Sequence, residues 1–110
     1  MPKEWPKNYF SLIFTTQRKN SNYMVFNELS NKYLSLIQNQ PGFLGIEIVR
    51  EDNGLGIEIS YWKDIVDIKN WRHVEDKQIY NKYKRENIFV WYQIRISQVH
   101  SEFEFGLDNL

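Results

Sequence analysis

The spacing of apolar residues divides the chain into strand-like and helix-like stretches. Residues 9–16 are rich in β-forming residues, and apolar side chains stand at both odd and even positions. This pattern predicts a central strand that is buried on both faces. After a polar break, apolar residues recur every three or four positions, which predicts an amphipathic helix. Its stripe consists of Tyr23, Phe26, Leu29, Tyr33, Leu36 and Ile37. The helix is expected to end at residues 40–42, because Pro41 cannot continue it.

Two further strand-like stretches, residues 43–50 and 55–62, flank Asn53-Gly54. This dipeptide favours a two-residue type I′ turn, which would set the register of a hairpin. Counting outward from the turn places Ile48 opposite Ile59 and Val49 opposite Glu58. One face of the hairpin is then apolar and the other is mixed.

The remaining third of the chain predicts one helical region and one strand. Residues 63–84 lack strand alternation, and their apolar spacing indicates a short helix, a break near His73-Val74 and a second helix. Residues 88–99 alternate like a strand, with Tyr92, Ile94 and Ile96 on one face. Phe103 and Phe105 can extend that strand before the chain frays.

This order of elements predicts an α+β fold, the ferredoxin-like βαββαβ plait. In that fold, two helices cover one face of a four-stranded antiparallel sheet. We expect a single domain over residues 1–110, with a core at about residues 9–105 and tails at 1–8 and 106–110.

The second face of the sheet is expected to be bare and apolar. It would expose Trp62, Trp91, Val49, Phe43 and one parity of the first strand, either Tyr9 and Ile13 or Phe10, Leu12 and Phe14. Such a face usually marks an interface, so we expect a homodimer joined through it. Polar residues share the same face and can leave a lined cavity beside the seam: Glu47, Glu58, Ser60, Gln93 and Arg95.

Composition narrows the classes of partner. Fourteen Lys and Arg balance fourteen Asp and Glu, which disfavours a nucleic-acid partner. There is no cysteine, and His73 and His100 are too few and too far apart to indicate a metal site. No apolar run has the length of a membrane span or a signal segment, so we expect a cytoplasmic protein without a membrane partner.

Several stretches resemble motifs of the antibiotic biosynthesis monooxygenase (ABM) domain family, over roughly residues 9–105. The family's entry into its second strand is similar to Pro41-Gly42-Phe43-Leu44-Gly45-Ile46-Glu47. The middle of the family's sequence is similar to Ile59-Ser60-Tyr61-Trp62-Lys63-Asp64 and to Trp71-Arg72. The C-terminal part of the family's sequence is similar to Arg85-Glu86 and to Trp91-Tyr92-Gln93-Ile94-Arg95-Ile96-Ser97-Gln98-Val99. The resemblance implies a dimeric α+β barrel with a pocket between sheet and helices.

The same resemblance implies a monooxygenase that oxidises a small aromatic or quinol-like metabolite without a cofactor. An alternative is a non-catalytic dimeric protein that binds a small hydrophobic ligand, for example in a stress response. The family's haem-degrading branch carries an Asn in strand one, a Trp on helix two and a His ten residues later. This chain keeps Trp71 but has Asn81 at the tenth position and Phe14, Thr15 or Thr16 in strand one, so haem is disfavoured.

Seven residues are candidates for the site. His73 could act as a base beside Trp71, or be a half-exposed residue at a helix break. Trp62 and Trp71 could stack a flat substrate, or pack the core and dimer. Arg95 could stabilise an oxyanion, or pair with an acid across the seam. The remaining candidates for substrate binding are Phe14, Tyr80, which would narrow the pocket, and Asn81.

Overall fold

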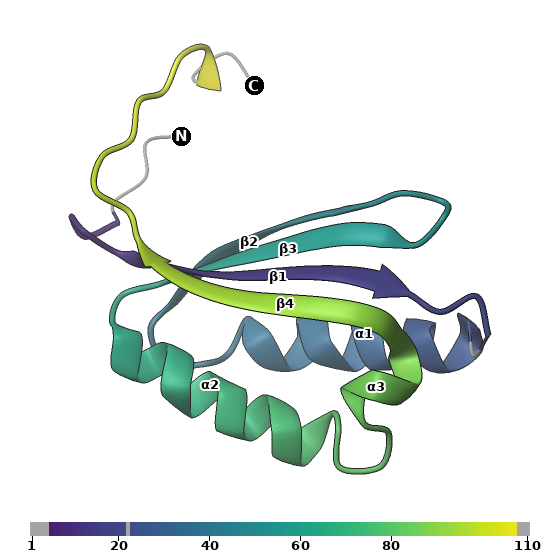
Figure 1. The fold of residues 1–110 in the computed structure, drawn as a ribbon. Coiled ribbons are helices and arrows are strands. Elements are labelled where there is room, and N and C mark those ends of the chain that lie inside the picture. The colour runs from purple at the N-terminus through teal and green to yellow at the C-terminus, as the bar shows by residue number, and fades with distance from the viewer. Residues whose placement is uncertain (1–4, 22, 108–110) are drawn as a thin grey trace.

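The computed structural model describes residues 5–21 and 23–107 and contains the predicted α+β plait (Figure 1). The outermost parts of the predicted tails, residues 1–4 and 108–110, lie outside the described residues. The elements are β1 Phe10–Arg18, α1 Tyr23–Ile37, β2 Phe43–Arg50, β3 Leu55–Trp62, α2 Ile65–Gln78, α3 Arg85–Ile88 and β4 Phe89–Gln98. The strands form one antiparallel sheet in the order β2-β3-β1-β4, and the helices lie on one of its faces.

The central strand β1 follows the prediction, because it pairs with β3 on one side and β4 on the other. Its even-numbered residues Leu12, Phe14 and Thr16 face the helices and are buried. The odd-numbered residue Ile13 lies on the other face, opposite Ile59 and Arg95. This parity places Tyr9 and Ile13 on the bare face, but the prediction that Tyr9 is exposed there is wrong, because its ring is buried against Trp5 and Tyr61.

The predicted hairpin exists, but its predicted register is wrong by one residue. Ile48 pairs with Glu58, and Glu47 pairs with Ile59. The loop contains three residues, 52–54, because the N–H of Gly54 donates to the carbonyl of Glu51 at 2.9 Å, and the N–H of Glu51 donates to the carbonyl of Leu55 at 2.8 Å. Within this loop, only Gly54 has a positive φ, of 96°. A type I′ turn needs positive φ at both central residues, whereas a type I turn followed by one left-handed residue makes a three-residue loop.

A shift of one residue moves every side chain of β3 to the opposite face of the sheet. Glu58, Ser60 and Trp62 therefore face the helices, and the prediction that they lie on the bare face is wrong. Trp62 is fully buried, and Phe43 packs against it with ring centroids 5.5 Å apart. The prediction that Phe43 is exposed on that face is likewise wrong.

The helical region after β3 is one continuous helix rather than two. Asp64 caps α2 by accepting a hydrogen bond from the N–H of Val66 at 3.2 Å. Residues 65–78 contain neither Gly nor Pro, so nothing interrupts the helix at His73-Val74, and Val74 packs against the core. The break comes later, between α2 and the short α3. The prediction that β4 extends through Phe103 and Phe105 is also wrong, since both side chains are almost fully exposed outside any strand.

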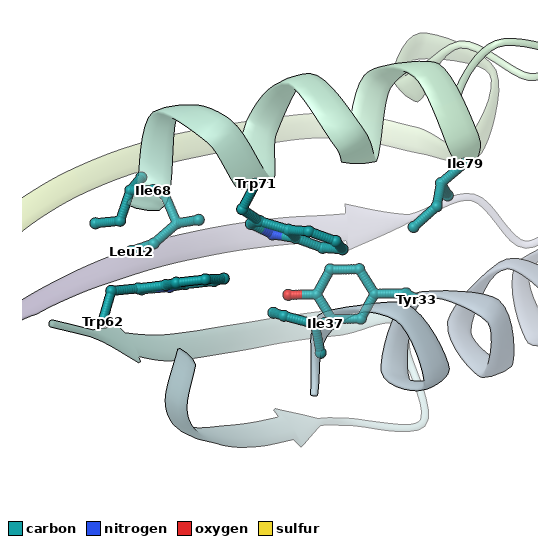
Figure 2. Close-up of a cluster of buried hydrophobic side chains, with 7 residues drawn as sticks. All are labelled: Leu12, Tyr33, Ile37, Trp62, Ile68, Trp71 and Ile79. Atoms are coloured by element: carbon teal, nitrogen blue, oxygen red, sulfur yellow. The ribbon is translucent and has the colours of Figure 1, made fainter. Parts of the chain in front are cut away.

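The main core lies between the sheet and the two long helices (Figure 2). Trp62 from β3 and Trp71 from α2 are stacked, with ring centroids 6.2 Å apart and ring planes 25° apart. The rings of Tyr33 from α1 and Trp71 make an edge-on contact, with their centroids 5.5 Å apart. These three rings join the sheet to both helices, and such contacts stabilise beyond the area that they bury. Within residues 5–21 and 23–107, no helix is both long and apolar enough to cross a lipid bilayer.

Gly54→Ala should lower the free energy of unfolding by about 1 to 3 kcal/mol, because alanine is strained at positive φ. A Cβ at this position would also lie 3.0 Å from the backbone oxygen of Arg18. Urea denaturation measures the change. Gly106→Ala is the control for the contact with Arg18. The φ of Gly106 is 82°, but a Cβ at this position would have no atom within 4 Å. Equal stability of Gly54→Ala and the unchanged chain would contradict the left-handed conformation of Gly54.

Candidate functional site

An acidic side chain, Glu58, lies at the centre of the space between sheet and helices. It lines three adjoining cavities, and Tyr33 lines all three with it. Burial raises the pKa of Glu58 to about 7, although the charge of Arg50 acts in the opposite direction. Among the described residues, none donates a hydrogen bond to its carboxylate, which would otherwise favour the charged form.

The second buried acid, Glu75 on α2, has a fixed partner. The guanidinium of Arg85 contacts Glu75 at 2.7 Å and Asp76 at 2.6 Å. Burial raises the pKa of Glu75 to about 7, and Arg85 opposes that rise. Arg85 also lies 4.2 Å from the centroid of the Tyr80 ring. Glu75 is therefore held in place, whereas Glu58 is available to a ligand.

Two of the three cavities are small. The chamber beneath α2 leaves about 10 Å³ and the chamber beneath α3 about 20 Å³, which is room for roughly one water molecule in each. The third cavity lies between α1 and the edge strand β2 and has a volume of about 210 Å³. Its lining consists of Phe26, Ser30, Tyr33, Leu34, Ile48, Arg50 and Glu58.

This third cavity is open to solvent, because Leu34 and Ile48 at its rim are exposed. A wider hollow continues along the same groove, lined by Leu34, Ile37 and Ile46 among others. Its walls are mainly apolar, with a few polar side chains, among them Arg50 and Glu58, which is the usual composition of a small-molecule site. A cavity of about 150 Å³ suffices for benzene, so this one has room for a single substituted ring.

A known relative identifies the family. The uncharacterised protein YqjZ of Bacillus subtilis is 36% identical over 91 residues, which cover 83% of this chain and 79% of the relative. The chain belongs to the YqjZ family. No protein-family model matches the sequence.

Solved structures with the same fold include a cofactor-independent oxygenase and a haem degrader. A variant of SnoaB, a cofactor-independent oxygenase from Streptomyces nogalater, has a TM-score of 0.70 at 10% identity, covering 86% of this chain and 96% of that one. A predicted antibiotic biosynthesis monooxygenase from Bordetella bronchiseptica has a TM-score of 0.65 at 14% identity, covering 84% and 98%. The haem degrader MhuD of Mycobacterium tuberculosis, with two haems in its active site, has a TM-score of 0.59 at 13% identity, covering 86% and 99%. The resemblance to ABM domains is thus confirmed at the level of the fold.

The seven predicted site residues divide into two groups in this YqjZ-family fold. Four lie between the sheet and the helices: Phe14, Trp62, Trp71 and Tyr80. Phe14 and Tyr80 line the two small chambers, and Trp62 and Trp71 pack the core beside them. The indole N–H of Trp62 donates to the hydroxyl of Ser60 at 2.9 Å, whereas that of Trp71 is buried without an acceptor.

The other three predicted site residues lie away from this space. His73 is exposed on α2, two residues and therefore about 200° around the helix from Trp71. Asn81 is exposed after the end of α2. Arg95 is exposed on the bare face of the sheet, where it donates a hydrogen bond to Gln93 at 2.7 Å. The structure does not bring these three side chains together with the two tryptophans.

Sequence reasoning missed the residues that surround the open cavity. Glu58 was assigned to the wrong face by the one-residue error in register. Tyr33 was recognised only as part of the apolar stripe of α1, and Arg50 had no assigned role. The available signal was Glu58 itself, a lone acid between Ile57 and Ile59 in an apolar strand.

Glu58→Gln should stabilise the fold above pH 7. Because folding raises the pKa of Glu58 from 4.5 to about 7, the carboxylate costs stability as pH rises through this interval. Glutamine carries no charge, so the variant should gain about 1 to 3 kcal/mol at pH 8 and almost nothing at pH 4. Urea denaturation at the two pH values measures this gain.

Glu75→Gln is the matched comparison: the pKa of Glu75 is also about 7, but this variant removes a charged partner of Arg85, so its gain in stability at pH 8 should be smaller than that of Glu58→Gln. A Glu58→Gln variant that is less stable than the unchanged chain at pH 8 would show that the Glu58 carboxylate has a stabilising partner.

Proposed function

We propose that this chain is a cofactor-independent monooxygenase that oxidises a small aromatic or quinol-like metabolite, with Glu58 as its base. The observation that carries the proposal is Glu58 itself, a recessed carboxylate with a pKa of about 7 that faces a cavity large enough for one ring. A base is most effective when its pKa lies near the working pH. The fold shared with SnoaB, a cofactor-independent oxygenase, supports the same chemistry.

The reaction begins when the Glu58 carboxylate takes the proton of a ring hydroxyl. The resulting phenolate passes one electron to molecular oxygen, and the phenoxyl radical and superoxide combine at a ring carbon that carries hydrogen, ortho or para to the hydroxyl. Proton return to the peroxide and loss of water convert this C–H carbon into a carbonyl, so that a hydroquinone and O₂ give a hydroxyquinone and H₂O. The apolar walls support the first step, because they destabilise charge on Glu58 and thereby make it a stronger base than an exposed carboxylate.

Haem does not fit the lining of this cavity. No His or Cys side chain lines it, and His73 and His100 are both exposed elsewhere. The volume of about 210 Å³ is smaller than that of usual cofactor pockets. MhuD therefore shares the fold of this chain but provides no model for its site.

Glu58→Gln should abolish oxygen consumption with hydroquinone and substituted hydroquinones, while the variant stays folded. The rate with the unchanged chain should rise as pH increases through about 7, because the base must be ionised. An oxygen electrode measures both effects, and Glu51→Gln in the exposed hairpin is the control. Binding of the same compounds without any oxygen uptake by the unchanged chain would reject the oxygenase and leave the non-catalytic binding protein.

We further propose that two copies join through the bare face of the sheet, as predicted from the sequence. Large apolar side chains remain exposed there, including Val49 at 70%, Ile57 at 44% and Trp91 at 43%. Trp5 covers only one corner of this face, where it contacts Tyr9 and Tyr61. Contiguous apolar surface of this kind is uncommon on a monomer.

Trp91→Asp should convert the dimer to a monomer, because dimerisation would bury an unpaired charge. Light scattering coupled to size exclusion measures the mass. The control is Met24→Asp, which replaces an apolar residue on α1 that is even more exposed, at 78%, and lies away from the sheet face. A Trp91→Asp protein that keeps the mass of a dimer would place the interface elsewhere.

A further inference from the structure

Two arginines beside the open cavity have no carboxylate partner among the described residues. Arg18 is 8% exposed and Arg50 is half-buried, yet the ion pairs within residues 5–21 and 23–107 join only Arg85 to its acids. Arg50 donates to the hydroxyl of Thr16 at 2.8 Å and to the carbonyl of Gly54 at 2.6 Å. Arg18 donates to the carbonyl of Asp52 at 3.4 Å, and its Nε is buried with no acceptor.

Both guanidinium groups gather around one aromatic ring. The central carbon of Arg18 lies 5.2 Å from the centroid of Phe26, and that of Arg50 lies 5.0 Å from it. Arg18 also lies 4.6 Å from the centroid of Tyr23. Aromatic faces attract cations, but they do not neutralise the charge. Two positive charges are therefore held close together at the end of the cavity formed by Phe26 and Arg50.

Glu58 attracts Arg50 electrostatically and lines the same cavity, but no ion pair or hydrogen bond joins the two side chains. Partly buried cations that are not paired with an anion lower the stability of the fold. An anion that enters the cavity would therefore bind more tightly because of their attraction. A guanidinium binds a carboxylate with two parallel hydrogen bonds, and three of the five N–H groups of Arg50 are not used by the two bonds above.

From this geometry we propose that the cavity takes an aromatic carboxylate, with its carboxylate at Arg50 and its ring extending toward Glu58 and Tyr33. Phe26 and Ile48 form apolar walls for the ring, and Arg18 adds to the positive potential behind Arg50. The inference rests on the proposed function for the role of Glu58, and it names the substrate class as hydroxylated aromatic monoacids. A single ring with one carboxylate suits the volume of about 210 Å³.

The test compares the binding of 2,5-dihydroxybenzoate and its uncharged analogue 2,5-dihydroxybenzamide, by calorimetry without oxygen. The unchanged chain should bind the acid about tenfold or more tightly than the amide, because the amide lacks the charge. Arg50→Gln should remove this preference, and Arg50→Lys, which keeps the charge but not the paired hydrogen bonds, should keep part of it. Arg95→Gln, on the bare face of the sheet, should leave the preference unchanged.

Equal binding of acid and amide by the unchanged chain, or no binding of either, would overturn the inference without use of any variant. A preference that persists in a folded Arg50→Gln protein would also overturn it, because the anion would then bind elsewhere.

The two proposals fail in different ways. Preferential binding of the acid with no oxygen uptake afterwards rejects the oxygenase and keeps the anion site. Oxidation of hydroquinone without any preference for the acid keeps the oxygenase and rejects the anion site.

Discussion

The pairing of β3 with its two neighbours decides which side chains enter the space between the sheet and the helices. Gly54 has a φ of 96°, and the loop that it completes has three residues rather than two. With that loop, β3 turns Glu58, Ser60 and Trp62 toward the helices. A two-residue loop would place the opposite set there. The Trp62 to Trp71 stack and the acid in the cavity both depend on this register.

Burial of Glu58 is a cost that the rest of the core must offset. Stacked and edge-on contacts among Trp62, Trp71 and Tyr33 join β3 to both long helices and stabilise the interior around the acid. Glu75 shows how the same protein treats a structural acid, which contacts Arg85 directly. Glu58 has no such contact, and acids left without one in a cavity are typical of functional sites. The fold therefore tolerates a loss of stability that leaves the pKa of this acid near 7.

Charge is distributed in this interior so that each group has a separate role in the proposed chemistry. Arg85 is occupied by two acids, whereas Arg50 is held by neutral oxygens from Thr16 and Gly54 and keeps its full charge. Arg50 and Glu58 line the same open cavity from neighbouring strands. A carboxylate at one and a hydroxyl at the other would orient a ring between them, and orientation of this kind contributes strongly to rate.

The sequence by itself determined the order of elements, the central position of β1 and the amphipathic stripe of α1, because these depend on local periodicity. Periodicity also separated the two faces of β4, and the motif-like stretches indicated the correct fold. Tertiary structure alone decided the register of β3, since Asn53-Gly54 is compatible with loops of two or three residues. It likewise decided that α2 runs through His73, because packing of Val74 on the core is a long-range contact. The site depends on the same contacts: a lone acid in an apolar strand becomes a candidate base only when the neighbouring strands and helices bury it.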